Sequence, residues 1–142
     1  MTADLITFLR ARLDEDEAVA RAATAGPWVE SGVGDHGWGV SFSALGSGVE
    51  ADDSDQGRAD AAHIARHDPA RVLAEVEAKR QIMGLHPVIG GWEDEDGHDR
   101  GLGCECCGHS EEYSDRGGWC ETLRLLALSY ADHPDYRDAW RP

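Results

Sequence analysis

The four cysteines of the chain lie close together in a stretch that has little else to fold around. Cys104, Cys106 and Cys107 are nearly adjacent, and Cys120 follows shortly after them. The surrounding segment, residues 87–119, is rich in glycine and acidic residues. A segment of this length without regular structure is uncommon inside a compact domain unless something holds it. The sequence therefore predicts that bonds to the cysteines, rather than apolar packing, order this segment.

The N-terminal sequence indicates whether the cysteines should form disulfides or bind a metal ion. Residues 1–5 contain neither the basic region nor the apolar run of a signal peptide. No apolar run in the chain approaches the roughly 20 residues that a membrane-spanning helix needs. We therefore expect a cytoplasmic protein, and disulfides are rare in that reducing compartment. The cysteines consequently predict a bound metal ion before they predict disulfides.

The spacing of the cysteines is typical of a zinc site. Cys104 and Cys107 form a C-x-x-C pair, which lets two thiolates reach one ion from a tight turn. Cys120 supplies a third sulfur at the start of a predicted helix, where the helix dipole favours a thiolate. Three sulfurs weaken the ion as a Lewis acid, so we expect a structural Zn²⁺. A closed tetrahedral site needs a fourth ligand, for which the candidates are His86, His98, His109 and Cys106.

A zinc-dependent hydrolase is the alternative interpretation. It would need an open site with three protein ligands and a water molecule. His98 or His109 would then lie near the ion, with Glu105 or Glu112 as the general base. The pattern of zinc deaminases is absent, because no proline precedes Cys104 and no H-x-E motif lies upstream. We therefore assign no catalytic residue and expect a protein without enzymatic activity.

The net charge of the chain limits the classes of partner that it can bind. With 28 acidic and 13 basic residues, the formal net charge is −15. A field of this sign repels the phosphates of nucleic acids and the headgroups of anionic lipids. We therefore exclude direct binding to nucleic acids or membranes. Two interpretations of this charge remain: a solvated acidic surface that keeps the protein soluble, or a surface that binds another protein with a basic surface.

Apolar periodicity and capping residues predict an α+β fold. Leu5, Leu9 and Leu13 recur at helical spacing, and Asp68-Pro69 is typical of a helix start. Between these helices, apolar residues scattered among Gly and Ser predict an antiparallel meander of two or three strands. The predicted helices cover residues 3–23, 58–67, 69–83 and 120–130, the meander lies within residues 28–51, and residues 52–57 are a loop.

These elements predict one domain that spans residues 1–142. Its first part, residues 1–86, combines helix, meander and helix. Its second part, residues 87–142, contains the zinc loop and a C-terminal helix. The fold class is α+β, with three main helices, a small antiparallel sheet and a C-terminal zinc-bound loop.

Four segments of the chain are distinctive: residues 23–28 (ATAGPW), 63–73 (HIARHDPARVL), 122–127 (TLRLLA) and 130–136 (YADHPDY). Together they resemble an uncharacterised family of small actinobacterial and actinophage proteins, which is described as a domain of unknown function. The resemblance implies a metal site at His86, Cys104, Cys107 and Cys120, whereas Cys106 is additional to the family pattern. It implies no enzymatic activity, and it suggests a phage or prophage setting.

Overall fold

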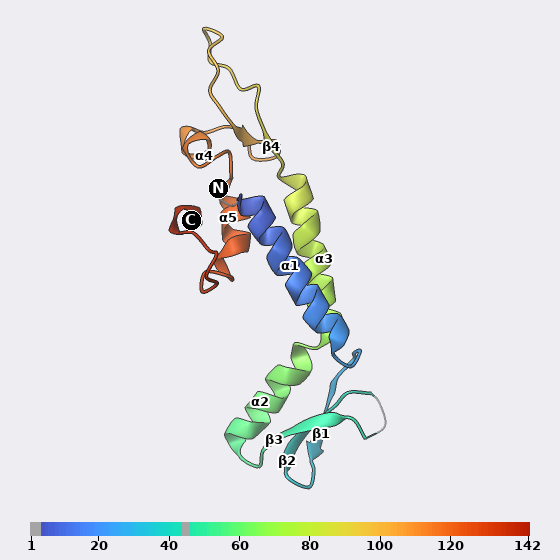
Figure 1. Cartoon of the computed structure of the whole chain (residues 1–142). Helices are drawn as coiled ribbons and strands as arrows, with labels where there is room; N and C mark the ends of the chain where they lie inside the picture. Colours follow the sequence, from blue (N-terminus) through green and yellow to red (C-terminus); the bar gives the residue numbers. More distant parts are fainter. Residues whose placement is uncertain (1–3, 44–45) are drawn as a thin grey trace. The chain divides into compact units, whose positions relative to one another are not determined.

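The computed structural model describes residues 4–43 and 46–142 (Figure 1). The chain divides into two compact units, of which one comprises Met1–Leu13 with Ala78–Pro142 and the other comprises Asp14–Glu77. Two long helices, α1 (Leu5–Ala22) and α3 (Pro69–Leu85), contribute residues to both units. In the described part of the chain, no helix is both long and apolar enough to cross a bilayer. The fold is α+β with several helices and a small antiparallel sheet, which confirms the predicted class.

The unit of residues 14–77 contains the predicted meander and the helix that covers it. Val40 in the central strand is buried and pairs with Val49 of the next strand. Trp38 lies on the same face as Val40, because side chains alternate along a strand, and the guanidinium of Arg58 lies 4.9 Å from the centre of its ring. Helix α2 (Asp55–Arg66) therefore covers this face. The strands follow the order β1 (Val29–Val33), β2 (Gly37–Ser41), β3 (Gly48–Asp52), all antiparallel.

Helix α2 begins earlier than the sequence predicts. The loop expected at residues 52–57 is short, because the helix already starts at Asp55. The hydroxyl of Ser54 accepts a hydrogen bond of 3.0 Å from the backbone N–H of Gly57, which caps the helix. A Cβ atom at Gly57 would lie 1.8 Å from the carbonyl oxygen of Asp52. Glycine at this position is thus what allows the first turn to pack directly against the end of β3.

Helix α3 begins where the Asp68-Pro69 pair predicts. One carboxylate oxygen of Asp68 accepts a hydrogen bond of 2.9 Å from the backbone of Arg71, and the other accepts one of 3.0 Å from the backbone of Trp28. These two backbone donors lower the pKa of Asp68 below its ordinary value. The same side chain therefore caps α3 and fixes the turn that leads from α1 into β1.

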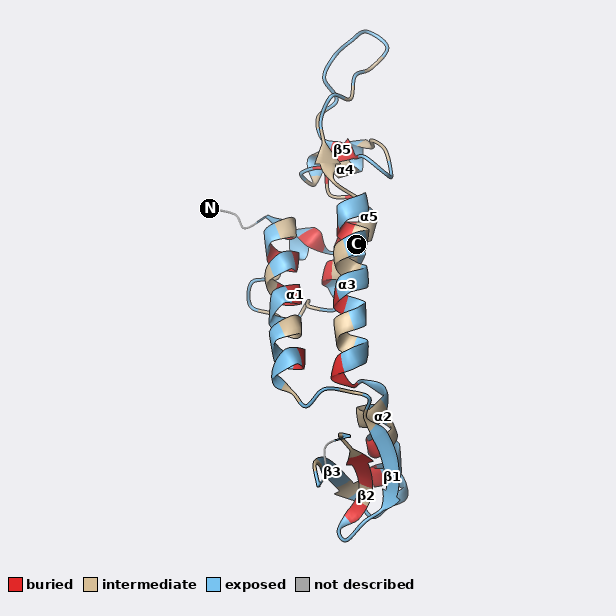
Figure 2. Cartoon of the chain, turned by 90° about the vertical axis from the view of Figure 1, so that its right-hand side faces the viewer, coloured by how far each residue is buried: buried red, intermediate tan, exposed pale blue. Residues whose placement is uncertain are grey.

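The other unit has an apolar core built on the first turns of α1. Leu5, Leu9 and Leu13 are each at most 1% exposed, as their helical spacing predicts. Figure 2 shows in red that α1 carries buried positions on one side. Phe8 adds a ring on that side, which packs against the rings of Trp140 at 5.0 Å and of Tyr130, His133 and Tyr136 at 5.7–6.3 Å. Residue 3, with which the predicted helix begins, lies outside the described part.

Residues 87–119, expected to be an irregular loop, contain regular structure. Strands β4 (Val88–Ile89) and β5 (Gly103–Cys104) form an antiparallel pair, and a bridge between Glu93 and Asp99 continues the hairpin. A short helix, α4 (Glu111–Asp115), follows. Periodicity could not reveal strands of two residues, because backbone hydrogen bonds define them. The chain then forms α5 (Glu121–Leu128), shorter than the predicted helix of residues 120–130, and the 3₁₀ helix η1 (Asp138–Trp140).

Candidate metal centre

Four side chains from four places in the sequence meet in the unit that contains the hairpin. His86 directly follows the last residue of α3, and Cys104 is the last residue of β5. Cys107 lies in the turn after β5, and Cys120 occupies the N-cap position of α5. We call His86, Cys104, Cys107 and Cys120 the Cys3His cluster. These are the residues that the resemblance implied as ligands.

The distances within the cluster fit a single metal ion. One potential ligand atom from each residue lies within 4.8 Å of those of the other three. The Nδ1 atom of His86 is 3.4 Å from the Sγ atoms of both Cys104 and Cys107, and 3.7 Å from that of Cys120. A tetrahedral zinc ion, with Zn–S near 2.3 Å and Zn–N near 2.0–2.1 Å, would hold such N and S atoms about 3.5 Å apart. Three cysteines and a histidine at these distances can bind a metal ion.

The turn between Cys104 and Cys107 presents both sulfurs to the same point. The backbone N–H of Cys104 donates to the carbonyl of Gly108 at 2.9 Å, and the N–H of Gly108 donates back at 2.8 Å. Gly108 has φ of +92°, a conformation that side chains disfavour. The N–H of Cys107 donates to the sulfur of Cys104 at 3.4 Å, which stabilises negative charge on that sulfur. Two backbone hydrogen bonds and one bond to the sulfur of Cys104 thus fix the turn.

The environment of Cys107 favours its protonated thiol until a cation binds. Cys104 and Cys120 are fully buried, whereas Cys107 is exposed as a residue. Loss of solvent around its sulfur, together with the neighbouring Cys104 and Cys120, raises the pKa of Cys107 to about 12. Burial and the charges of Cys107 and Cys120 also raise the pKa of Tyr113. A divalent cation would reverse this balance, because it stabilises the thiolate forms.

The other candidates for the fourth ligand lie outside the cluster. The Nε2 atom of His109 donates a hydrogen bond of 2.8 Å to the carbonyl of Arg100. His98 lies 3.3 Å from a carboxylate oxygen of Asp94, in a separate exposed group that also includes Asp96. Cys106 is exposed and does not belong to the group of described residues whose ligand atoms lie close together.

The two candidate bases of the hydrolase interpretation, Glu105 and Glu112, are not among the residues that meet in the Cys3His cluster. The carboxylate of Glu112 accepts a hydrogen bond of 3.0 Å from Arg124 and lies 3.5 Å from the guanidinium of Arg116. Glu105 is exposed, and its backbone N–H donates to the carbonyl of Pro87. Sequence reasoning missed the role of Arg124, which is 2% exposed and links α5 to α4. The signal that could have revealed it was a charged residue between the apolar Leu123 and Leu125.

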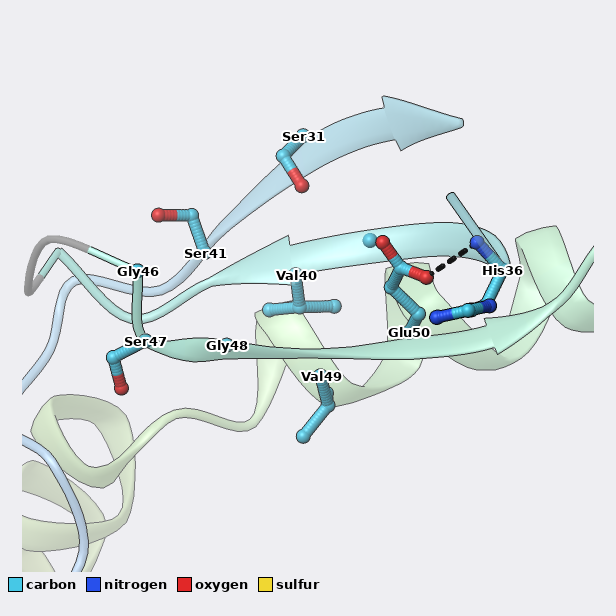
Figure 3. A pocket seen from close by; sticks show the side chains of 10 residues that line it. Ser31, His36, Val40, Ser41, Gly46, Ser47, Gly48, Val49 and Glu50 are labelled. Carbon is cyan, nitrogen blue, oxygen red and sulfur yellow. Dashed lines mark hydrogen bonds between the residues drawn. The ribbon is translucent and has the colours of Figure 1, made fainter. Parts of the chain in front are cut away.

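A hollow on the sheet offers less chemistry than the cluster. Its volume is about 640 Å³, and its lining consists mainly of glycines and serines from β1, β2, β3 and residues 46–47 (Figure 3). Among the described residues that line it, the ionisable ones are His36 and Glu50. The backbone N–H of His36 donates to the carboxylate of Glu50 at 2.8 Å. This hydrogen bond orders the β1–β2 turn, and among the described contacts none of the lining serines is hydrogen-bonded to His36 or Glu50, as an activated nucleophile would be to its base.

Comparison with known proteins supplies a family without an activity. No curated protein and no solved structure matches the chain. One family model does match, over residues 2–142, so the match includes every residue of the Cys3His cluster. The description of that family assigns it no function. On this match, the chain belongs to the family of unknown function DUF6221.

Proposed function

We propose that this chain is a small acidic zinc-binding protein that acts by binding another protein and not by catalysis. His86, Cys104, Cys107 and Cys120 hold one structural Zn²⁺ in this proposal. The observation that carries it is the set of three distances, 3.4, 3.4 and 3.7 Å, from the histidine nitrogen to the three sulfurs. They agree with the separation that a tetrahedral zinc ion imposes on its ligands.

The donor set supports a structural role over a catalytic one. Four protein ligands complete a tetrahedral shell and leave no position for the water molecule that a zinc hydrolase activates. Thiolates and imidazole together suit zinc better than magnesium or calcium, which prefer oxygen ligands. Glu112, a candidate base of the alternative, is paired with the buried Arg124. These observations favour an ion that orders the protein.

A structural ion would supply order that this part of the chain lacks otherwise. Strands β4 and β5 have two residues each, and α4 has five. Elements this short have little stability of their own in water. An ion bound through His86, Cys104, Cys107 and Cys120 joins the end of α3, the turn after β5 and the start of α5. Its binding energy would therefore contribute directly to folding.

The proposed partner is a protein with a basic surface. The net charge of −15 disfavours direct binding to nucleic acids and anionic membranes. Charge complementarity would instead accelerate association with a cationic protein surface. A reducing compartment keeps thiolate ligands from forming disulfides, so we place the protein in the cytoplasm. A phage or prophage setting is part of the proposal and rests only on the resemblance noted from the sequence.

Elemental analysis of the purified protein tests the metal, and cobalt substitution tests its ligands. We expect one zinc per chain, and we expect Co²⁺ to give the absorption bands of a tetrahedral site with thiolate ligands. A protein without stoichiometric metal, or one that folds equally well in a chelator, would refute the metal centre.

Affinity capture from cells of the source organism tests the partner. We expect a basic protein to be retained at moderate salt and released at high salt. Capture of no protein, combined with turnover of a small molecule by the purified chain, would overturn the non-catalytic role.

A further inference from the structure

An apolar hollow lies in the unit of residues 14–77, between α1 and α3. It encloses about 320 Å³. Val19, Ala20 and Ala23 line it from the side of α1, and Pro69 and Val72 line it from the side of α3. Val19 is 72% exposed, although it is a large apolar residue. Concave apolar surface of this kind is where ligands and protein partners bind, because covering it removes apolar area from water.

One wall of this hollow is an aromatic ring held firmly in place. The backbone N–H of Trp28 donates to Asp68 at 3.0 Å, and its indole N–H donates to the carbonyl of Thr24 at 2.8 Å. Its ring stacks on that of Phe42 with 4.0 Å between the centres. Tryptophan is among the residues that contribute most to protein interfaces. Because this ring is already fixed, a partner would not have to order it on binding.

A second, polar hollow shares two residues with the first. It encloses about 770 Å³ and is also lined by Trp28 and His67. Glu30, His63 and Arg66 add polar groups to its lining. The imidazole rings of His63 and His67 stack with 4.2 Å between their centres. A segment lying across both hollows would therefore meet an apolar lining in one hollow and a more polar lining in the other.

The charge of this unit indicates what kind of segment would bind there. Residues 14–77 include 14 acidic residues and 4 arginines, with no lysine, so the unit carries −10 of the total −15. A carboxylate lines each hollow, from Asp16 in the apolar one and from Glu30 in the polar one. Arg66 is the permanent cation among the described lining residues. The surrounding field therefore attracts a cationic segment and repels an acidic one.

We propose that these two hollows form a docking site for a basic, amphipathic peptide segment of a partner protein. A large apolar side chain of the segment fills the hollow beside Val19 and Trp28, while its lysines or arginines face the acidic surroundings. An amphipathic segment laid into a groove is a common form of peptide recognition. This inference rests on the proposed function, since it takes the partner to be basic, and it names the surface and the segment that meet.

A synthetic peptide provides the probe. We would use a fluorescein-labelled amphipathic helix of leucine and lysine, about 18 residues or five turns long, and measure its binding to the full-length zinc-loaded protein by fluorescence anisotropy. A peptide of the same composition with scrambled leucines controls for charge alone, and a leucine–glutamate peptide controls for apolar binding alone. We expect the amphipathic basic peptide to bind more tightly than either control. Equal binding of the scrambled peptide would overturn the proposal.

A matched pair of variants locates the site. Val19→Gln removes apolar surface from the hollow, and Val33→Gln makes the same change at a strand residue that is also more than half exposed. Because both side chains are exposed, neither change should unfold the protein. We expect Val19→Gln to weaken binding about fivefold to tenfold, as for an important interface residue, and Val33→Gln to leave binding unchanged. Equal affinities of Val19→Gln and wild type would refute the docking site.

The same variants separate this inference from the proposed function. If affinity capture retains a basic partner on wild type and on Val19→Gln alike, the protein binds a partner elsewhere and only the docking site is wrong. If wild type captures no partner and the purified chain turns over a small molecule, the proposed function itself fails.

Discussion

Replacing Cys104 by serine should strongly destabilise the part of the chain around the Cys3His cluster. Cys104 is fully buried, and its sulfur lies 3.4 Å from the ring nitrogen of His86. Structural zinc contributes about 10–16 kcal/mol in small zinc-binding peptides. Losing one of four ligands would remove on the order of a quarter of that value, about 2.5–4 kcal/mol. Since whole domains are stable by only about 5–15 kcal/mol, this loss is large.

Thermal unfolding followed by circular dichroism measures the effect. For a chain of this size, about 3 kcal/mol corresponds to a fall in Tm of roughly 10 °C. The control is Cys106→Ser, which makes the same chemical change two residues away at an exposed cysteine outside the cluster. We expect the control to keep its zinc content and its Tm. Equal losses of zinc and of Tm in both variants would refute the assignment of ligands.

Three further predictions concern the ion, a buried charge and a close contact. Zinc affinity should fall as pH falls, because the pKa of the Cys107 thiol is raised to about 12 without metal and each thiolate ligand must release a proton; zinc titrations at two pH values measure this. Glu112→Gln should cost about 1–2 kcal/mol in denaturant unfolding, since it leaves the buried Arg124 without the charge of its carboxylate partner, which is itself partly exposed. Gly57→Ala should destabilise by more than about 1 kcal/mol, because its Cβ would meet a carbonyl at 1.8 Å, whereas Gly84→Ala has open space and should stabilise α3 by about 0.5–1 kcal/mol.

Each of these predictions has an outcome that would contradict it. A zinc affinity independent of pH would mean that the cluster is already deprotonated without metal. Glu111→Gln is the control for Glu112→Gln, because the pair that Glu111 forms with Arg100 is exposed and should contribute less than about 1 kcal/mol. Equal costs at the two glutamates would show that the buried arginine does not need its partner. Equal effects at Gly57 and Gly84 would show that the structure accommodates a Cβ atom at Gly57 despite the close approach of α2 to β3.

The fold could be predicted where local chemistry determines it. The spacing of Leu5, Leu9 and Leu13 marks the buried side of α1, and Asp68 marks the start of α3 through bonds to nearby backbone. The predicted start of α2 was wrong, because residues 52–57 are polar and Gly57, a poor helix former, lies in the first turn of the helix. Glycine is needed there by a contact with β3, which no local pattern reveals. The short hairpin strands depend on backbone pairing between residues 88–89 and 103–104, and their side chains carry no signal of it.

The candidate site could be predicted in part. The C-x-x-C spacing and Cys120 indicate three sulfurs, because their local positions suit one ion. Residue spacing left four candidates for the remaining ligand, and only the resemblance favoured His86. The structure brings His86 to the sulfurs because α3 ends immediately before it. Proximity of this kind depends on how helices are placed, which short-range patterns do not specify.

The way α5 begins has a consequence for its response to metal supply. Its N-cap residue is Cys120, whose side chain makes no capping hydrogen bond to the helix backbone. A helix of eight residues is too short to persist alone in water. Under the proposed coordination, the ion replaces the missing cap and anchors the first turn. The length of this helix would then depend on the concentration of free zinc. Metal scarcity would loosen the C-terminal segment before it affected the sheet of β1, β2 and β3.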